Sequence, residues 1–227
     1  MSYLLRLVLP DRPGALGAVA TALGEAGADI VSLDVLERGN GVAVDDVVVD
    51  LPRDRLPDSL ISAAQRVPDV EVESIRPFAG TLSTQRELEL LEELAGAPEG
   101  TTGKLLAVEL PRAFHSGWAV LLAGSAPDRF AVLAASDAAP GFEGVRLPWM
   151  PLAAPRLLPS EEDWLPERWR AMAIEMMAVP FGPAPEDEDG AVIVLGRSGG
   201  PAFRRSELLR LAHLAGIAAT VASLPAE

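Results

Sequence analysis

The sequence predicts an α+β protein made of two domains. Residues 3–77 alternate between strand-like and helix-like patterns, in the order strand, helix, strand, strand, helix, strand. The pattern breaks at Pro77-Phe78-Ala79-Gly80, and a mixed second half follows that closes with a long apolar helix. We therefore expect one domain over residues 1–80 and a second domain over residues 81–227.

The composition excludes several classes of function. The net charge of −14 at pH 7 is spread over both halves without a basic stripe, which argues against a nucleic-acid partner. The absence of cysteine excludes disulfides, thiol catalysis and thiolate zinc sites. No apolar run approaches the ~20 residues that a bilayer span requires, and the chain begins directly with a strand pattern. We expect a cytoplasmic protein with no membrane partner.

The first strand and the first helix meet with almost no intervening residues. One face of the strand carries four apolar or aromatic side chains, Tyr3, Leu5, Leu7 and Leu9. Helical spacing begins at Leu16. Between the two elements, Pro13 fits the first helical turn, where a missing N–H is tolerated, and Gly14 permits a close approach of the backbone to a ligand.

This junction has the chemistry of a small-anion site. The first N–H groups of a helix have no partner within the helix and lie at the positive end of its dipole, so they can bind a carboxylate. Asp11 before the helix and Asp29 at the start of the second strand add acceptors for an ammonium group. Together these groups describe a site for a free amino acid. The alternative is structural: Asp11 caps the helix, and Pro13-Gly14 only forms the turn.

Residues 3–77 resemble an ACT domain, a small regulatory module. The resemblance rests on the order of the elements and on two motifs, D-x-P-G-x-L at residues 11–16 and G-A-D-I at residues 27–30. It implies a ferredoxin-like βαββαβ fold, a homodimer through this module and an amino acid as the ligand. The ligand-binding residues that it implies are Leu9, Asp11, Arg12, Pro13, Gly14, Ala15, Leu16, Asp29 and Ile30. Leu9 stands where serine-binding members carry a histidine, which argues against serine.

The rest of the first domain is predicted as a hairpin, a helix and a last strand. Strands at residues 29–38 and 42–51 flank Asn40-Gly41, the favoured pair for a type I′ turn. Asp45 and Asp46 interrupt the alternation of the third strand, which predicts a bulge there. Because neighbouring residues of a strand point to opposite faces, we expect these aspartates to be solvated and not to form a metal or acid–base pair. The domain is completed by a helix at residues 60–64 and a strand at residues 70–75.

The second half predicts an antiparallel sheet with helices. Its strand-like runs are residues 118–123, 129–136, 172–180 and 191–197, and its helix-like runs are residues 84–95, 104–114 and 204–224. Pro111 is expected to kink the helix at residues 104–114 or end it early. Residues 137–160 are rich in Pro, Gly and Ala with little period, which is typical of a lid or binding loop.

The run from MAVPFG to the terminal helix, residues 172–224, resembles the C-terminal half of a GAF domain, a sensory module. The resemblance implies a GAF-like α/β module in which a central antiparallel sheet carries helices on one face and a small-molecule pocket on the other. The sequence has no cyclic-nucleotide signature and no chromophore cysteine, so no ligand follows from it. An empty pocket, with the fold used for dimerisation or docking, is the alternative.

Residues that carry catalysis are scarce. The two histidines are His115, beside Ser116, and His213 in the terminal helix, and neither has a partner at catalytic or metal-ligand spacing. Seven large side chains in the second half form either core or a pocket: Trp149, Met150, Trp164, Trp169, Met172, Met176 and Met177. We expect no catalytic residue, no metal and no cofactor.

The sequence therefore favours a non-enzymatic, amino-acid-binding regulatory protein that acts allosterically on a partner enzyme. Two alternatives stay open. One is a ligand-free dimerisation or interaction module, and the other is an enzyme whose site lies in residues 137–177. The shortage of His, Cys and Lys makes the enzyme the weakest of the three.

Overall fold

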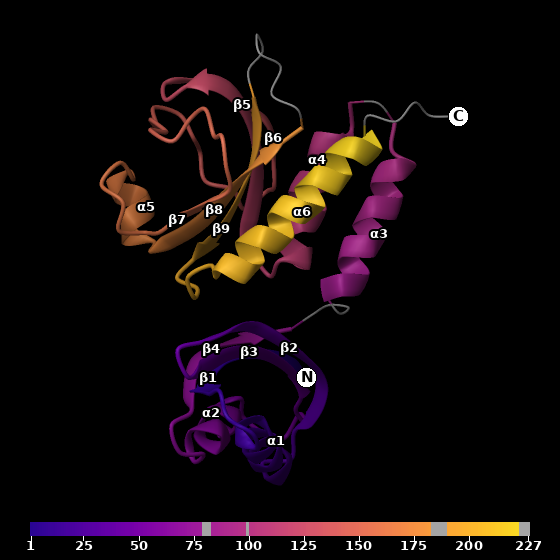
Figure 1. Ribbon diagram of the computed structural model, residues 1–227, viewed down its shortest axis with the longest axis vertical. Helices are drawn as coiled ribbons and strands as arrows, with labels where there is room; N and C mark the ends of the chain where they lie inside the picture. The colour runs from indigo at the N-terminus through magenta and orange to yellow at the C-terminus, as the bar shows by residue number, and fades with distance from the viewer. Residues whose placement is uncertain (79–82, 99, 183–189, 223–227) are drawn as a thin grey trace. The chain divides into compact units, whose positions relative to one another are not determined.

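The computed structural model describes residues 1–78, 83–98, 100–182 and 190–222 (Figure 1). The chain divides into two compact units, Met1–Gly80 and Thr81–Glu227. Each unit has its own sheet and its own hydrophobic core. None of the helices in the described ranges combines the length and the hydropathy that crossing a bilayer requires.

The first unit has the predicted βαββαβ order of elements. Its strands are β1 (Ser2–Pro10), β2 (Asp29–Gly39), β3 (Val42–Asp50) and β4 (Glu71–Pro77), and its helices are α1 (Ala15–Glu25) and α2 (Asp58–Gln65). Both helices cover the same face of the sheet (Figure 1). Alternate strand residues, among them Leu5, Leu7, Val47 and Val49, meet Val19 of α1 and Leu60 of α2 in the core.

The four strands of this sheet are antiparallel in the order β2-β3-β1-β4, which places β2 at an edge. The predicted β2–β3 hairpin is present. Its turn residues Asn40 and Gly41 have φ values of 54° and 79°. Positive φ at both central residues is what a type I′ turn requires, so the Asn-Gly pair sets the hairpin and its register.

The predicted bulge lies on the neighbouring strand. Asp45 and Asp46 pair in unbroken register with Leu7 and Arg6 of β1. The β2–β3 pairing has two register shifts, and the one beside the aspartates falls between Val35 and Glu37, so the extra residue there belongs to β2. The two aspartates keep their alternation and point to opposite faces, as an extended strand dictates.

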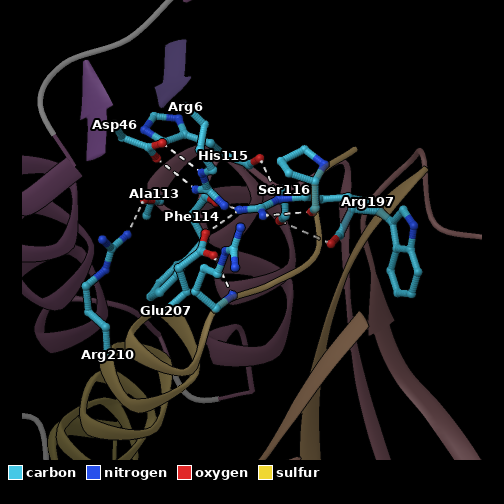
Figure 2. Close-up of polar contacts among 12 residues, drawn as sticks. Arg6, Asp46, Ala113, Phe114, His115, Ser116, Arg197, Glu207 and Arg210 are labelled. Atoms are coloured by element: carbon cyan, nitrogen blue, oxygen red, sulfur yellow. Dashed lines mark hydrogen bonds and ion pairs between the residues drawn. The ribbon is translucent and has the colours of Figure 1, made fainter. Parts of the chain in front are cut away.

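The expectation that both aspartates are solvated is wrong. Asp46 forms a two-point ion pair with Arg6, whose Nε and Nη2 donate to its two carboxylate oxygens at 2.8 Å each (Figure 2). Asp45 points to the other face, where α1 and α2 pack, and it is buried there. A break in an alternating pattern therefore marked two buried polar groups on opposite faces of the sheet.

The second unit has the predicted central antiparallel sheet with helices. Its elements are α3 (Ser83–Ala95), α4 (Thr102–Ala113), β5 (Trp118–Ala126), β6 (Arg129–Ala135), β7 (Arg156–Leu158), α5 (Glu167–Ala171), β8 (Ile174–Phe181), β9 (Ala191–Ser198) and α6 (Arg205–Ala222). The strand order is β6-β5-β9-β8-β7, and every neighbouring pair is antiparallel. In Figure 1, α3, α4 and α6 lie on one side of this sheet and α5 on the other. The last two residues of the predicted terminal helix lie outside the described residues.

Strand alternation sends side chains of this sheet into two separate clusters. Ala119 and Leu121 of β5 join the cluster that packs against α3, α4 and α6. Their neighbours Trp118, Val120 and Leu122 join the cluster on the opposite face. That second cluster also takes six buried side chains from residues 137–160, namely Phe142, Val145, Leu147, Trp149, Met150 and Leu158. The stretch predicted to be a lid is thus a packed cover over one face of the sheet.

Candidate functional site

The loop that joins β1 to α1 ends in a left-handed glycine. Gly14 has φ 88° and is the N-cap residue of α1, which no side chain caps. A Cβ at Gly14 would meet no atom within 4 Å, so the loop needs glycine for its backbone conformation and not for space. At the start of the loop, the Asp11 N–H donates to the Gly41 carbonyl at 2.9 Å. The uncapped first turn of α1 leaves backbone donors for an anion.

Asp11 forms an ion pair and does not cap α1. Arg38 of β2 donates to one Asp11 carboxylate oxygen from Nε, at 3.0 Å, and from Nη2. This hydrogen bond raises the pKa of the Arg38 guanidinium. The Arg38 side chain is 66% exposed and that of Asp11 is 25% exposed, so the pair lies at the surface. Asp11 is therefore neither the predicted helix cap nor an acceptor held free for an ammonium group.

A cavity of about 190 Å³ lies beside this ion pair. It is bounded by the end of β1, the first turn of α1, and β2 and β3. Its walls are Leu9, Pro10, Asp11, Arg12, Ala15, Leu16, Val35, Arg38, Ala43 and Asp45. The structure thus brings Leu9, Asp11, Arg12, Ala15 and Leu16, all predicted site residues, around one hollow. Pro13 and Gly14 belong to the same loop but are not among the wall residues.

Asp45 is one of five wall residues that the sequence analysis did not assign to the site, with Pro10, Val35, Arg38 and Ala43. It lies on β3, between Leu7 of β1 and Val35 of β2. It shares its side of β3 with Ala43 and Val47, which belong to the core. Asp45 is only 2% exposed, and its Oδ1 atom is buried without a hydrogen-bond partner among the described residues.

The electrostatic surroundings of Asp45 disfavour its charged form. Burial raises the pKa of Asp45, the Arg38 guanidinium partly offsets that effect, and the carboxylates of Asp46 and Asp11 add to it. The sequence did contain a signal for this residue, since a carboxylate at an inward position of β3 interrupts the apolar pattern. That signal indicated a bulge as readily as a buried charge.

Asp29 and Ile30 lie at the far end of β2 from the cavity. Asp29 pairs with Asp50 at the end of β3, whereas Arg38 pairs with Ala43 beside the loop. The strand between Asp29 and Arg38 is about 30 Å long at a rise of ~3.3 Å per residue. Within one chain, Asp11 and Asp29 therefore do not lie together, and their common role in one site stays a prediction. A role for Asp29 and Ile30 in the same site requires a second chain.

In the second unit, aromatic side chains fill the sheet face opposite α4 and α6. Phe142 packs edge to face against Trp118 and Trp169, with ring centroids 6.4 and 4.9 Å apart. Of the tryptophans and methionines singled out in the sequence, most are buried in the two cores, Trp164 is partly buried and Met172 is exposed. The core interpretation of this group therefore holds for most of its members.

A second hollow, of about 460 Å³, lies at the edge of this sheet. It is lined by Asp128, Phe130, Val132, Phe142, Glu143, Gly144, Val145 and Arg146. Its three charged residues are all exposed. Because water already solvates these charges, the hollow presents no unsatisfied group to a ligand, unlike the cavity beside Asp45.

Buried charges in the second unit are paired. Arg197 at the end of β9 is 3% exposed and donates from Nη2 to Glu207 of α6 at 2.5 Å (Figure 2). It also donates to the backbone carbonyls of Phe114, at 3.0 Å, and His115, at 3.3 Å. Its guanidinium lies 3.9 Å from the centroid of the Phe203 ring. These contacts hold the end of α4 against β9 and α6. The helix ends soon after Pro111, as predicted.

The sequence-adjacent histidine and serine do not form a catalytic pair. Ser116 Oγ donates to the Trp118 carbonyl at 3.4 Å, and His115 has φ 48° in the turn that follows α4. His213 is exposed on α6. In the described parts of the chain, no group of three or more His, Cys, Asp or Glu side chains is placed to hold a metal ion.

The first unit is a ferredoxin-like α+β domain with a small cavity at its β1–α1 loop. Residues 3–69 match the family model described as "ACT domain", so the first unit is an ACT domain. The matched family is a regulatory one, and no catalytic domain is matched. No curated protein matches the sequence.

Solved structures similar to the second unit include several GAF domains. One, from a phosphoenolpyruvate-protein phosphotransferase of Coxiella burnetii, is 15% identical, covers 62% of this chain and 92% of its own, and has a TM-score of 0.47. The phycoerythrobilin-bound GAF domain of a cyanobacterial phytochrome is 12% identical, covers 63% of this chain and 95% of its own, and has a TM-score of 0.46. A GAF domain/HD domain protein from Geobacter sulfurreducens is 18% identical, with coverages of 62% and 94% and a TM-score of 0.38. No ligand and no function of the second unit follow from these likenesses.

Proposed function

We propose that this chain is a regulatory protein without catalytic activity of its own, whose ACT domain binds a free amino acid beside the β1–α1 loop. The observation that carries the proposal is the cavity. Leu9, Asp11, Arg12, Ala15 and Leu16, all assigned to ligand binding by the resemblance, line it together. Residues that are close in sequence often line different surfaces, so their gathering around one hollow supports a binding role.

The size and chemistry of the cavity suit a single amino acid. Sites for drug-sized ligands enclose about 300–1,000 Å³, and this cavity, at about 190 Å³, is smaller. The uncapped first turn of α1 and the Arg38 guanidinium can bind a carboxylate. Leu9, Leu16 and Val35 offer apolar contact to the rest of the ligand.

We propose further that the ACT domain forms a homodimer through β2. This strand is at the edge of the sheet, and Val31 and Val35 on it are each 51% exposed. An apolar, unpaired strand edge is a template for another strand. If two copies pair antiparallel through β2, the Asp29 end of one strand faces the Arg38 end of the other. That arrangement would bring Asp29 and Ile30 to the site from a second chain.

A screen of the full chain against the twenty common L-amino acids at millimolar concentration tests the binding proposal. Far-ultraviolet circular dichroism follows thermal unfolding, because all four tryptophans belong to the second unit and cannot report on the first. A ligand at a hundred times its Kd stabilises the folded state by about 2.7 kcal/mol. We therefore expect at least one amino acid to raise the midpoint of the unfolding transition of the first unit. Circular dichroism detects this transition, and tryptophan fluorescence does not.

A cavity-filling variant locates the binding. Ala15→Leu places a larger side chain in the wall, whereas Ala18→Leu makes the same change on an exposed position of α1. We expect the first variant to lose binding and the second to keep it. Retained binding by Ala15→Leu would show that the amino acid binds outside this cavity.

The alternative function is a ligand-free dimerisation module. The exposed apolar residues of β2 favour it, because they support a dimer whether or not the cavity is filled. A dimer by light scattering together with no stabilisation by any amino acid would establish this alternative. A monomer at micromolar concentration would contradict the dimer proposal.

A further inference from the structure

The cavity of the ACT domain holds a buried acceptor that no described donor satisfies. Asp45 lines the cavity wall, is 2% exposed, and has no hydrogen-bond partner for Oδ1 among the described residues. The nearby carboxylates are already engaged, since Asp11 pairs with Arg38 and Asp46 pairs with Arg6. A buried charged oxygen without a donor is destabilising, so a ligand that supplies a donor there gains affinity.

We propose that Asp45 binds the ammonium group of the amino acid, while Arg38 and the first turn of α1 bind its carboxylate. The inference rests on the proposed function and assigns the ammonium group to a residue of β3, in place of Asp11 or Asp29. An ammonium group has three N–H donors and no acceptor, which matches a carboxylate oxygen that lacks a partner. The resulting hydrogen bond is charge-assisted on both sides and forms away from water.

The charges around the cavity favour a zwitterion. Its walls carry two cations, Arg12 and Arg38, and two anions, Asp11 and Asp45. A ligand without net charge leaves this balance intact, provided that its positive end meets Asp45. A second carboxylate on the ligand side chain would approach Asp45 or Asp11 and be repelled. The site therefore selects against aspartate and glutamate.

The remaining walls define the side chain of the ligand. Leu9, Ala15, Leu16, Val35 and Ala43 are apolar and surround the charged groups. A polar side chain would lose its water there without gaining hydrogen bonds, whereas an aliphatic one is favoured by burial. With about 190 Å³ available, the ligand class is a small aliphatic amino acid such as valine or leucine.

Titration calorimetry of the full chain tests this assignment with four probes: L-valine, L-leucine and their deaminated analogues 3-methylbutanoate and 4-methylpentanoate. For the unmodified protein we expect the analogues to bind about ten- to a hundredfold more weakly, because they lack the donor to Asp45. Asp45→Asn should weaken the amino acids by a similar factor and leave the analogues almost unchanged. Asp50→Asn removes the same charge from the far end of the same strand and should change no affinity by more than about threefold.

The outcomes separate this inference from the proposed function. If an amino acid and its deaminated analogue bind the unmodified protein equally well, Asp45 is not the ammonium site, although the ACT domain still binds an amino acid. This comparison needs no variant, so it decides the matter even if Asp45→Asn does not fold. If the twenty-amino-acid screen finds only a polar or acidic ligand, the aliphatic ligand class is wrong. If none of the twenty binds, both proposals fail.

Discussion

Buried charges in the two units are satisfied to different degrees, although Arg6 and Asp46 form a buried ion pair in the ACT domain as well. In the GAF-like unit, Arg197 and Glu207 are buried together, and Arg197 also satisfies backbone carbonyls at the end of α4. In the ACT domain, Asp45 is buried at the cavity wall with one oxygen unpartnered among the described residues. A satisfied charge holds elements together, whereas an unsatisfied one adds to the free energy of the empty fold. In the proposed function, an amino acid would supply the donor that Asp45 lacks among the described residues.

The same contrast appears in how the two units use space. In the ACT domain, a Cβ at Gly14 would enter open space beside the loop. In the second unit, a Cβ at Gly196 would lie 2.0 Å from Cζ2 of Trp118. One glycine serves the backbone conformation of an open loop, and the other makes room for a ring in a filled core.

The largest expected effect comes from breaking the buried ion pair. Arg197→Met removes the guanidinium that pairs with the buried Glu207 carboxylate, and removing one member of such a pair typically costs about 3–5 kcal/mol. We expect that loss in the unfolding free energy of the second unit, followed by tryptophan fluorescence in urea. Arg170→Met, on the exposed end of α5, is the control and should change stability by less than about 0.5 kcal/mol. Equal stability of the two variants would remove the contrast between the units.

An intermediate effect is expected from alanine at the two glycines. Gly196→Ala overpacks the ring of Trp118 and should lower the stability of the second unit by about 1–3 kcal/mol. Gly14→Ala meets only the strain of its positive φ, about 1–2 kcal/mol, and should leave the fluorescence transition unchanged. Circular dichroism and fluorescence measured on the same samples distinguish the two. A shift of the fluorescence midpoint by Gly14→Ala would contradict the assignment of its effect to the first unit.

The smallest expected effect is the pH dependence that Asp45 contributes. Its pKa in the folded state is raised above the ordinary value of 3.8, chiefly by burial and against the influence of Arg38. Its contribution to stability is therefore fully present below the unfolded-state pKa and is lost as pH rises through the folded-state pKa. Compared with the unmodified chain, Asp45→Asn should have equal stability near pH 3.8 and become the more stable protein towards pH 7.

The measurement is urea unfolding of the ligand-free protein at several pH values, in which titrations shared by both proteins cancel in the difference. Asp46→Asn supplies the contrast one residue away. It leaves Arg6 without its two-point partner and should be less stable than the unmodified chain at neutral pH, by about 1.5–3 kcal/mol. A pH-independent difference between Asp45→Asn and the unmodified protein would show that Asp45 has the same pKa folded and unfolded.

Much of the first unit could be predicted because its signals are local. Period-two alternation indicated the strands, and Asn40-Gly41 specified the hairpin by its turn geometry. The position of the bulge could not be predicted, because an irregular residue in one strand and an extra residue in its partner disturb the sequence pattern alike. Only the pairing of Asp45 with Val35 shows which strand carries it.

The candidate site could be predicted only where its residues are close together in the sequence. The loop residues Asp11–Leu16 are contiguous, so one motif identified them. Arg38 and Asp45 reach the site from other strands, and their approach depends on the order of strands in the sheet. The Asp11–Arg38 ion pair spans 27 residues, which no local pattern reports. In the second unit, the three-residue β7 and the five-residue α5 are too short to establish a period, and both were missed.

During folding, the exposed edge of β2 is open to two competing processes: correct pairing with a folded copy and incorrect pairing with a partly folded one. Val31, Leu33 and Val35 are exposed along a strand whose outer backbone groups face away from its own sheet. An edge of this kind accepts any extended chain, and a partly folded copy can pair with it out of register as readily as a folded copy in register. Rapid capture by a folded copy would protect the edge, and delayed capture would lead to aggregates. A higher protein concentration should therefore raise the yield of soluble protein on refolding by speeding correct pairing, and lower the yield by speeding misassembly.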